Sequence, residues 1–205
     1  PRSSSSAASD VYKRQEQITV SVSGMNAIML SAQALVPYGS KVVVLLPSWP
    51  NIPAVQRIMG AKVEGVPIGM KDGKWSLDMD QVFDACDSKT TAIIINSPNN
   101  PSGWTMSNHE QKTLLEFARK KGIWIVSDEV YARISFNASH APSFSEVIEK
   151  DDRVIIVNSF SKSWAMTGWR LGWITAPAHL GVQFEKLNEY NLSLIHISEP
   201  TRLSL

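Results

Sequence analysis

The stretch "RVIIVNSFSKSWAMTGWRLGW" occupies residues 153–173. It opens with a run of apolar, mostly β-branched residues, which is typical of a strand buried on both faces of a sheet. Lys162 follows, together with the hydroxyl residues Ser159 and Ser161, and Arg170 offers a planar fork that suits phosphate. A lysine directly after a buried strand is either a surface residue or an amine nucleophile at the edge of a sheet. The ends of the other predicted strands help to distinguish these two interpretations.

Similar apolar runs recur along the chain and alternate with helical patterns. Strands are predicted at residues 18–22, 41–47, 61–68, 91–97, 124–130, 153–160 and 170–176. Helices are predicted at residues 24–36, 51–60, 78–86 and 107–122, and the last of these begins at a Ser107/Asn108 cap and ends at Gly122. This alternation predicts an α/β fold, a three-layer α/β/α domain around a mostly parallel, seven-stranded sheet. In such sheets, ligands bind outside the carboxyl ends of the strands.

The composition limits the class of protein. The chain has 205 residues, of which 43% are hydrophobic and 19% charged, enough to bury the core of one large domain. No apolar run is long enough to span a membrane, and a net charge of +1 does not favour a nucleic-acid partner. Cys86 is the sole cysteine, so no intrachain disulfide can form. We expect a cytoplasmic protein with no metal site.

One inverted DNA repeat can encode segments at both ends of the sequence. Residues 10–15 read DVYKRQ, which GAT GTG TAT AAG AGA CAG encodes; the reverse complement, CTG TCT CTT ATA CAC ATC, encodes LSLIHI, found at residues 192–197. Such an inverted DNA repeat is typical of sequencing-library adapters and has no physical role in a protein. We therefore expect residues 1–15 and 192–205 to be non-native tails, and residues 16–191 to be the natural part of a truncated chain.

Residues able to bind a ligand gather at the predicted strand ends. Gly24 lies between a strand and a helix, and a helix N-terminus can bind phosphate, although most such junctions are only tight turns. Trp49, between two prolines, is either a core residue or a platform for an aromatic ligand. Asn100 lies in a proline-rich turn and can point its amide at a ligand. Asp128, with Tyr131 after it, can cap a helix or pair with a protonated ring nitrogen.

Together with Lys162, these strand ends supply a phosphate site, an aromatic platform, an amide, an acid–phenol pair and an amine. This set of groups fits a phosphorylated aromatic aldehyde, which indicates pyridoxal 5'-phosphate (PLP) as the cofactor.

Three motifs resemble those of a known family. "SFSKSWAMTGWRLGW" resembles the lysine signature of the class I/II, fold-type-I PLP-dependent aminotransferases. "NNPSG" resembles their Asn-Pro-Thr/Ser-Gly motif, and "SDEVY" resembles their Asp-x-x-Tyr motif. The order and spacing match from Ile18 to Tyr190. The resemblance implies a large, PLP-binding domain without the small domain whose arginine holds the substrate carboxylate, and a homodimer when the protein is full length.

The resemblance also implies a role for each matching residue. Lys162 forms the Schiff base with PLP and moves a proton at the substrate α-carbon as general base and acid. Asp128 bonds the pyridine nitrogen, Asn100 and Tyr131 bond the ring hydroxyl oxygen, and Trp49 stacks on the ring. The implied phosphate ligands are Gly24, Met25, Asn26, Ser159, Ser161 and Arg170, the first three through their backbone amides. Met25 and Asn26 depart from the small or hydroxyl side chains that are commoner in the family.

The implied activity is transfer of an amino group between an L-amino acid and a 2-oxo acid. Alternatives on the same fold are a PLP-dependent C–S lyase, a decarboxylase and an ACC-synthase-like enzyme. A non-enzymatic alternative is the aminotransferase-like domain of a PLP-sensing transcription regulator. Because the small domain is missing, the sequence does not indicate which amino acid is used, and we expect the 205-residue chain to be inactive on its own.

Overall fold

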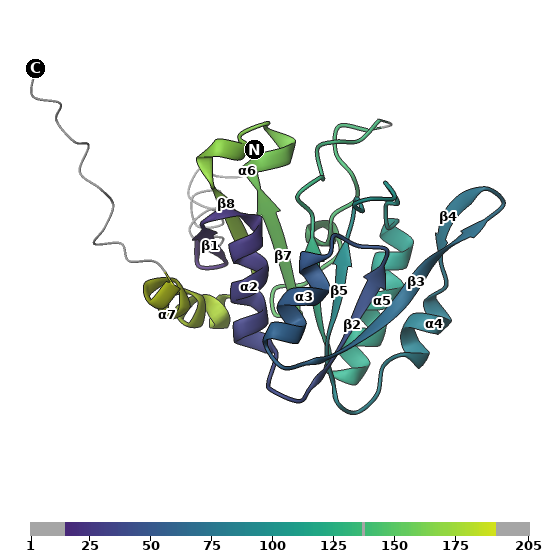
Figure 1. Cartoon of the computed structure of the whole chain (residues 1–205), viewed down its shortest axis with the longest axis horizontal. Coiled ribbons are helices and arrows are strands. Elements are labelled where there is room, and N and C mark those ends of the chain that lie inside the picture. The colour runs from purple at the N-terminus through teal and green to yellow at the C-terminus, as the bar shows by residue number, and fades with distance from the viewer. Residues whose placement is uncertain (1–14, 137, 192–205) are drawn as a thin grey trace, which may run out of the picture.

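Figure 1 shows the computed structural model of the chain, which describes residues 15–136 and 138–191. Its centre is a single sheet with the strand order β1-β8-β7-β6-β5-β2-β3-β4. Neighbouring strands from β7 to β3 are parallel, whereas the pairs β1–β8, β7–β8 and β3–β4 are antiparallel. The strands are β1 (Ile18–Ser21), β2 (Lys41–Leu46), β3 (Lys62–Lys71), β4 (Lys74–Leu77), β5 (Thr90–Asn96), β6 (Trp124–Asp128), β7 (Val154–Ser159) and β8 (Gly172–Thr175).

Helices cover both faces of the sheet (Figure 1). One layer holds α2 (Ser23–Leu35), α3 (Asn51–Ile58), the 3₁₀ turn η3 (Ala178–Leu180) and α7 (Gly181–Asn191). The other holds α4 (Met79–Asp84), α5 (Asn108–Lys121) and the 3₁₀ turn η1 (Phe144–Glu146). Along β2, the buried Val42 and Val44 face the first layer and the buried Val43 and Leu45 face the second. The central strands are therefore apolar on both faces because both faces are covered.

The α/β fold class predicted from the sequence is confirmed, and each predicted strand and helix is present. The predicted number of strands was one too small, because the sheet has eight strands. The additional strand, β4, pairs with β3 through a turn at Asp72 and Gly73, which have φ values of 51° and 73°. Asp-Gly is a strong hairpin signal, but β4 is short and mostly exposed, so it lacks the apolar run that marks the other strands.

The caps of α5 follow the prediction. The Ser107 hydroxyl accepts a hydrogen bond from the Glu110 amide at 3.3 Å, and Glu110 Oε2 accepts one from the Ser107 amide at 2.7 Å. This reciprocal pair is a capping box, and it satisfies two otherwise unpaired amides of the first turn. Gly122 ends the helix in the left-handed region, with φ at 69°.

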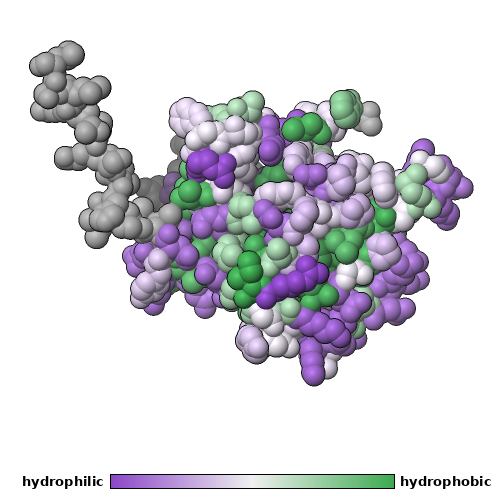
Figure 2. Space-filling view, viewed as in Figure 1, coloured by the Kyte–Doolittle hydropathy of each residue, from purple (hydrophilic) through white to green (hydrophobic). Residues whose placement is uncertain are grey.

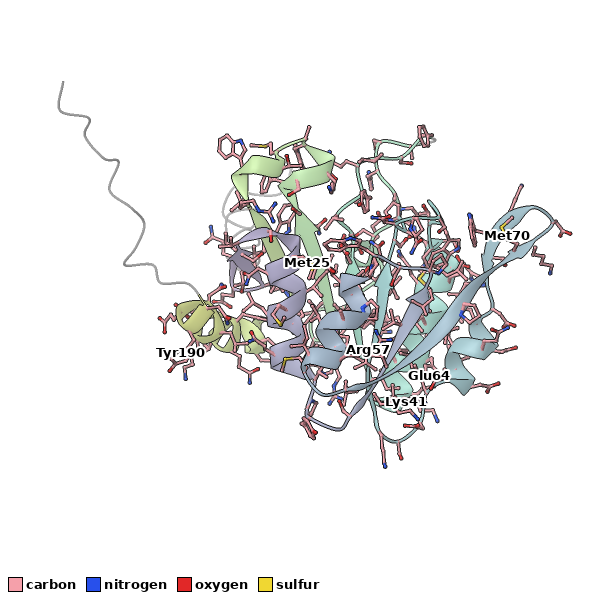
Figure 3. The ribbon with its side chains drawn as sticks, viewed as in Figure 1. Met25, Lys41, Arg57, Glu64, Met70 and Tyr190 are labelled. Atoms are coloured by element: carbon pink, nitrogen blue, oxygen red, sulfur yellow. The ribbon has the colours of Figure 1, made fainter. Side chains whose placement is uncertain are left out.

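The residues at the two ends of the parallel strands differ in charge. Figure 3 places Met25 at the N-terminal end of α2, on the side of the carboxyl ends of these strands, and Lys41 and Glu64 toward their amino ends. Lys41 Nζ lies 3.2 Å from an oxygen of Asp87 and 3.9 Å from one of Glu64, an exposed charge network of the kind that contributes little free energy. Among the described residues, no helix combines the length and apolarity needed to cross a membrane.

Candidate active site

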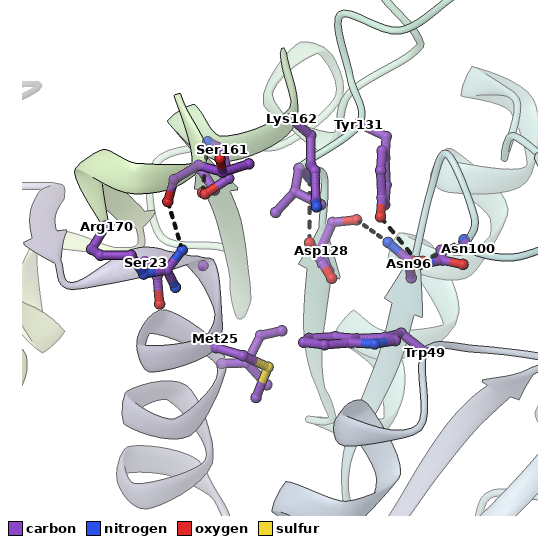
Figure 4. Close-up of a pocket in the computed structure, with 15 residues that line it drawn as sticks. Ser23, Met25, Trp49, Asn96, Asn100, Asp128, Tyr131, Ser161, Lys162 and Arg170 are labelled. Carbon is purple, nitrogen blue, oxygen red and sulfur yellow. Dashed lines mark hydrogen bonds between the residues drawn. The ribbon is translucent and has the colours of Figure 1, made fainter. Parts of the chain in front are cut away.

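The carboxyl ends of three neighbouring parallel strands open into a pocket of about 290 Å³. Asn96 ends β5, Asp128 ends β6 and Ser159 ends β7. Asn96 and Asp128 lie opposite each other in the sheet register. The N-terminus of α2 and the loop after β2 complete the walls (Figure 4). The pocket therefore lies where a doubly wound sheet is expected to bind its ligand.

All but one of the predicted site residues line this pocket: Gly24, Met25, Trp49, Asn100, Asp128, Tyr131, Ser159, Ser161, Lys162 and Arg170. The exception is Asn26, whose side-chain oxygen accepts a hydrogen bond from the Val22 amide at 3.2 Å. The Asn26 amide itself donates to the Ser23 hydroxyl at 3.4 Å. Both groups form hydrogen bonds within the first turn of α2, and the role of Asn26 as a phosphate ligand stays a prediction.

Asp128 is a buried acid without a basic partner. It is 4% exposed, and its Oδ1 accepts a hydrogen bond from the Val130 amide at 3.3 Å. Within residues 15–136 and 138–191, no lysine, arginine or histidine forms an ion pair with it. Burial raises the pKa of Asp128 to about 7, against the lowering effect of the Val130 amide, and the neighbouring negative charge of Glu129 adds to the rise. Such a group is suited to a ligand that brings a protonated nitrogen.

Asn100 and Tyr131 form a pair beside Asp128. The Asn100 side-chain amide donates a hydrogen bond to Tyr131 Oη at 3.1 Å. Because the phenol oxygen accepts this bond, its own proton remains available to donate to a third oxygen. The pair can therefore hold a phenolic oxygen of a ligand.

Lys162 extends from α6 (Phe160–Ser163), a short helix that begins where β7 ends. The Ser159 hydroxyl caps this helix by accepting a hydrogen bond from the Ser161 amide at 3.1 Å. Figure 4 shows the lysine side chain pointing into the pocket toward Asp128, with the flat indole of Trp49 on the far side of Asp128. An aromatic ring that reaches Asp128 can thus lie against Trp49 and bring its substituents within reach of the lysine amine.

The other end of the pocket suits an anion. Gly24 and Met25 at the N-terminus of α2 line this end, and the buried hydroxyls of Ser159 and Ser161 hydrogen bond to each other at 3.0 Å. Arg170 follows the 3₁₀ turn η2 (Thr167–Trp169) in the left-handed region, with φ at 49°. Its Nη1 donates a hydrogen bond to the Thr167 carbonyl oxygen at 3.0 Å. Figure 4 places its side chain beside Ser23, so the guanidinium and the helix N-terminus serve the same end of the pocket.

Five residues that the sequence analysis did not assign also line the pocket: Ser23, Ile28, Asn96, Val130 and Thr167. Val130 and Thr167 lie inside the quoted motifs, and Ser23 precedes Gly24. Ser23 has a positive φ of 84°, which turns the chain from β1 into α2. Asn96 follows a buried apolar run, and its position at a strand end was the one signal that could have identified it.

Comparison with known proteins identifies the family. The family model described as aminotransferase class I and II matches residues 6–202. The chain belongs to the class I and II aminotransferase family. An aminotransferase of this family that is similar to the chain is the arginine–pyruvate transaminase of Pseudomonas aeruginosa, at 34% identity over 84% of the chain and 43% of the relative.

Solved aminotransferase structures are also similar. The N-succinyldiaminopimelate aminotransferase of Mycobacterium tuberculosis has a TM-score of 0.80 at 30% identity, over 86% of this chain and 46% of that one. A PLP-dependent aminotransferase of Streptococcus suis has a TM-score of 0.78 at 31% identity, over 86% and 46% of the two chains. The chain therefore spans a little under half the length of these relatives.

PLP is the cofactor of this aminotransferase family, and the pocket fits it. The buried, unpaired carboxyl of Asp128 matches a protonated pyridine nitrogen, and the Asn100–Tyr131 pair matches the ring hydroxyl. The helix N-terminus, the two serine hydroxyls and Arg170 match the phosphate. Lys162 supplies the amine that an aldehyde requires.

Proposed function

We propose that the longer protein to which this chain belongs is a PLP-dependent aminotransferase that moves an amino group between an L-amino acid and a 2-oxo acid. The observation that supports this most strongly is that the amine of Lys162 points into the same pocket as the buried, unpaired carboxyl of Asp128 (Figure 4). The first gives an attachment point and a base, and the second gives a partner for a protonated ring nitrogen.

The proposal gives residues of the pocket distinct roles in the reaction. Bound PLP supplies an electron sink for the electron pair left when the substrate α-carbon loses its proton. Asp128 keeps the proton on the ring nitrogen, which makes the sink effective, and Asn100 with Tyr131 fixes the ring oxygen. Lys162 acts as general base when it takes the proton from the α-carbon, and it then donates this proton as general acid.

The remaining residues hold the cofactor in place. Trp49 supports the ring, while Ser159, Ser161 and Arg170 bind the phosphate together with the backbone amides of Gly24 and Met25.

The test is the Lys162→Ala variant of the protein encoded by the complete gene. The wild-type protein should show the visible absorbance of PLP bound to a lysine. The variant should lose this absorbance, and its rate of transamination should fall by ~10³-fold or more. Lys120→Ala, on the exposed face of α5, is the matched control and should change neither. A borohydride-reducible bond that persists in Lys162→Ala would refute the assignment. Products distinguish transfer, which gives a 2-oxo acid and pyridoxamine phosphate, from a lyase reaction, which gives pyruvate with ammonia or a thiol.

We also propose that the longer protein is a cytoplasmic homodimer. The support for a dimer is that Trp169, which precedes the pocket residue Arg170, is a large aromatic side chain that is 71% exposed. Sedimentation of the complete protein measures the oligomeric state directly. A monomer at micromolar concentration would overturn the proposal.

The tails at residues 1–15 and 192–205 are proposed to be non-native. The support is that one inverted DNA repeat can encode both DVYKRQ and LSLIHI, while the family model's match reaches from residue 6 to residue 202 and so enters both tails. Sequencing the gene from its source DNA tests this proposal. Recovery of DVYKRQ and LSLIHI in the genomic sequence would refute it.

A further inference from the structure

Three loops supply the contacts proposed for the PLP ring. Trp49 follows β2, Asn100 follows β5 and Asp128 ends β6. The relative positions of these loops decide whether the three groups meet one flat ring. Two buried asparagines, Asn96 and Asn99, lie between them, and neither is among the residues assigned above to the cofactor.

Asn96 joins the Asn100 turn to the strand that ends in Asp128. It is 3% exposed, and its Oδ1 accepts a hydrogen bond from the Asn100 amide at 2.7 Å. Its Nδ2 donates to the Asp128 carbonyl oxygen at 3.2 Å. Asn96 lines the pocket, yet these two contacts use both ends of its amide group. Its side chain therefore hydrogen bonds to the backbone of Asn100 and Asp128, which leaves its pocket-facing position a supporting one.

Asn99 joins the same turn to the loop that carries Trp49. It is 5% exposed, and its Nδ2 donates a hydrogen bond to the Pro47 carbonyl oxygen at 2.9 Å. Its Oδ1 accepts from the Ser102 amide at 3.1 Å and from the Ser102 hydroxyl at 2.6 Å. Pro47 lies two positions before Trp49, so this contact fixes the loop close to the indole.

We propose that Asn96 and Asn99 are positioning residues that set Asn100, Trp49 and Asp128 in one arrangement for the PLP ring; this rests on the proposed function. Asparagine suits both places because its short side chain carries a donor and an acceptor together. Aspartate has the acceptor without the donor, and alanine has neither. A buried backbone group left without its partner keeps its desolvation cost, so the loops shift to recover a partner and the ring contacts move with them.

The test measures PLP binding to the complete protein. The readouts are the dissociation constant of PLP and the pH titration of its visible absorbance when bound. Asn96→Ala and Asn99→Ala should each raise the dissociation constant roughly tenfold, the size of effect expected for a lost supporting hydrogen bond. Asn99→Asp keeps the oxygen that accepts from Ser102 and loses the donor to Pro47, so it should behave like Asn99→Ala. The matched control is Asn188→Ala, whose amide donates to the Val20 carbonyl oxygen at 2.9 Å and does not line the pocket.

A double-mutant cycle separates positioning from general destabilisation. If Asn99 acts through Trp49, Asn99→Ala should weaken PLP binding much less in a Trp49→Ala background than in the wild type. The same holds for Asn96→Ala in an Asn100→Ala background. A merely structural defect weakens binding by the same factor in both backgrounds. Should Asn96→Ala fail to fold, Asn96→Ser, whose hydroxyl can meet one of the two contacts, serves in the same cycle.

The outcomes are distinct. Unchanged PLP affinity in the asparagine variants, or equal factors in both backgrounds, overturns the positioning role while leaving the proposed function intact. Failure of the wild-type complete protein to bind PLP overturns the proposed function itself, and the positioning role with it.

Discussion

The buried carboxyl of Asp128 lowers the stability of the ligand-free fold near neutral pH. Its pKa is raised from 3.8 to about 7, chiefly because burial removes the carboxyl from water. Between these two values the folded chain keeps a proton that the unfolded chain has released. Stability therefore falls as pH rises through this window, and it is fully regained only below the unfolded pKa. A ligand that places a positive charge beside Asp128 reverses this cost.

Asp128→Asn should remove the pH-dependent cost in the cofactor-free protein. Each pKa unit corresponds to about 1.4 kcal/mol, so the variant should gain on the wild type by up to roughly 4 kcal/mol between pH 4 and pH 8. Urea unfolding at the two pH values measures this gain. The same variant should lose PLP-dependent activity, because an amide cannot hold a proton on the ring nitrogen.

The control for this prediction is Asp84→Asn on the exposed surface of α4, which should leave the pH dependence of the wild type unchanged. An unfolding free energy that varies with pH equally in wild type and Asp128→Asn would contradict the prediction.

The residues for which a ligand role is proposed could be singled out from the sequence, whereas those for which a supporting role is proposed could not. Lys162, Asp128, Asn100 and Tyr131 all lie in motifs, and the structure brings them to one pocket. Asn99 was read as part of a turn, because its contact with Pro47 joins loops far apart in the sequence and leaves no local pattern. The family resemblance implied Asn26 as a phosphate ligand, and this stays a prediction, while the structure shows Asn26 in hydrogen bonds of the first helical turn.

At the scale of elements, β8 passes close to the turn that begins α2. A Cβ atom at Gly172 would lie 2.7 Å from the backbone carbon of Ser23 and 2.8 Å from the amide nitrogen of Gly24. It would also lie 2.8 Å from the carbonyl oxygen of Asn158 on β7. All three atoms are backbone, so none can rotate away. Glycine at this position lets β8 and β7 pack closely against the N-terminus of α2, which lines the pocket.

Gly172→Ala should therefore disturb the packing of α2 against β7 and β8 and, with it, the end of the pocket proposed to bind phosphate. The added methyl must displace the first turn of α2, and forced packing of this kind costs about 1–3 kcal/mol. We expect a lower free energy of unfolding and weaker PLP binding, measured by urea denaturation and by absorbance titration of the complete protein. Gly69→Ala on β3 is the matched control, since its nearest contact for a Cβ is 3.9 Å away. Equal behaviour of the two variants would argue against a special role for Gly172.

Elements with strong local signals were predicted well. The capping box and terminal glycine of α5 fixed both of its ends, because these interactions are contained in neighbouring residues. The last predicted strand was placed from Arg170, but the observed β8 begins at Gly172. Arg170 lies outside it in the left-handed region, in the turn that directs its side chain to the pocket. A single residue in that conformation has no sequence pattern unless it is glycine or asparagine.

At the scale of the whole molecule, the strand order assembles the site. β7, β6, β5 and β2 are consecutive in the sheet, and their ends deliver Ser159, Asp128, Asn96 and the Trp49 loop side by side. The alternation of strands and helices predicts a parallel sheet, but it does not fix which strands are neighbours. The grouping of motifs into one pocket was therefore implied by the family resemblance rather than by the periodicity.

Some apolar side chains of the described residues are exposed. Hydrophobic residues lie among polar ones on the face shown in Figure 2, and Val20 on the edge strand β1 is 61% exposed. Exposed apolar side chains at a sheet edge favour association with further protein. The relatives are about twice as long as this chain, which spans 43% of the arginine–pyruvate transaminase.

We therefore predict that the 205-residue chain does not catalyse transamination, whereas the protein encoded by the complete gene does. The pocket described here holds groups for the cofactor, but its two basic residues, Lys162 and Arg170, are assigned to the aldehyde and the phosphate, which leaves none for a substrate carboxylate. Turnover of an L-amino acid with a 2-oxo acid is measured for both proteins under the same conditions, with Lys162→Ala of the complete protein as the background. Turnover by the 205-residue chain above that background would show that the large domain alone suffices, and the prediction would be wrong.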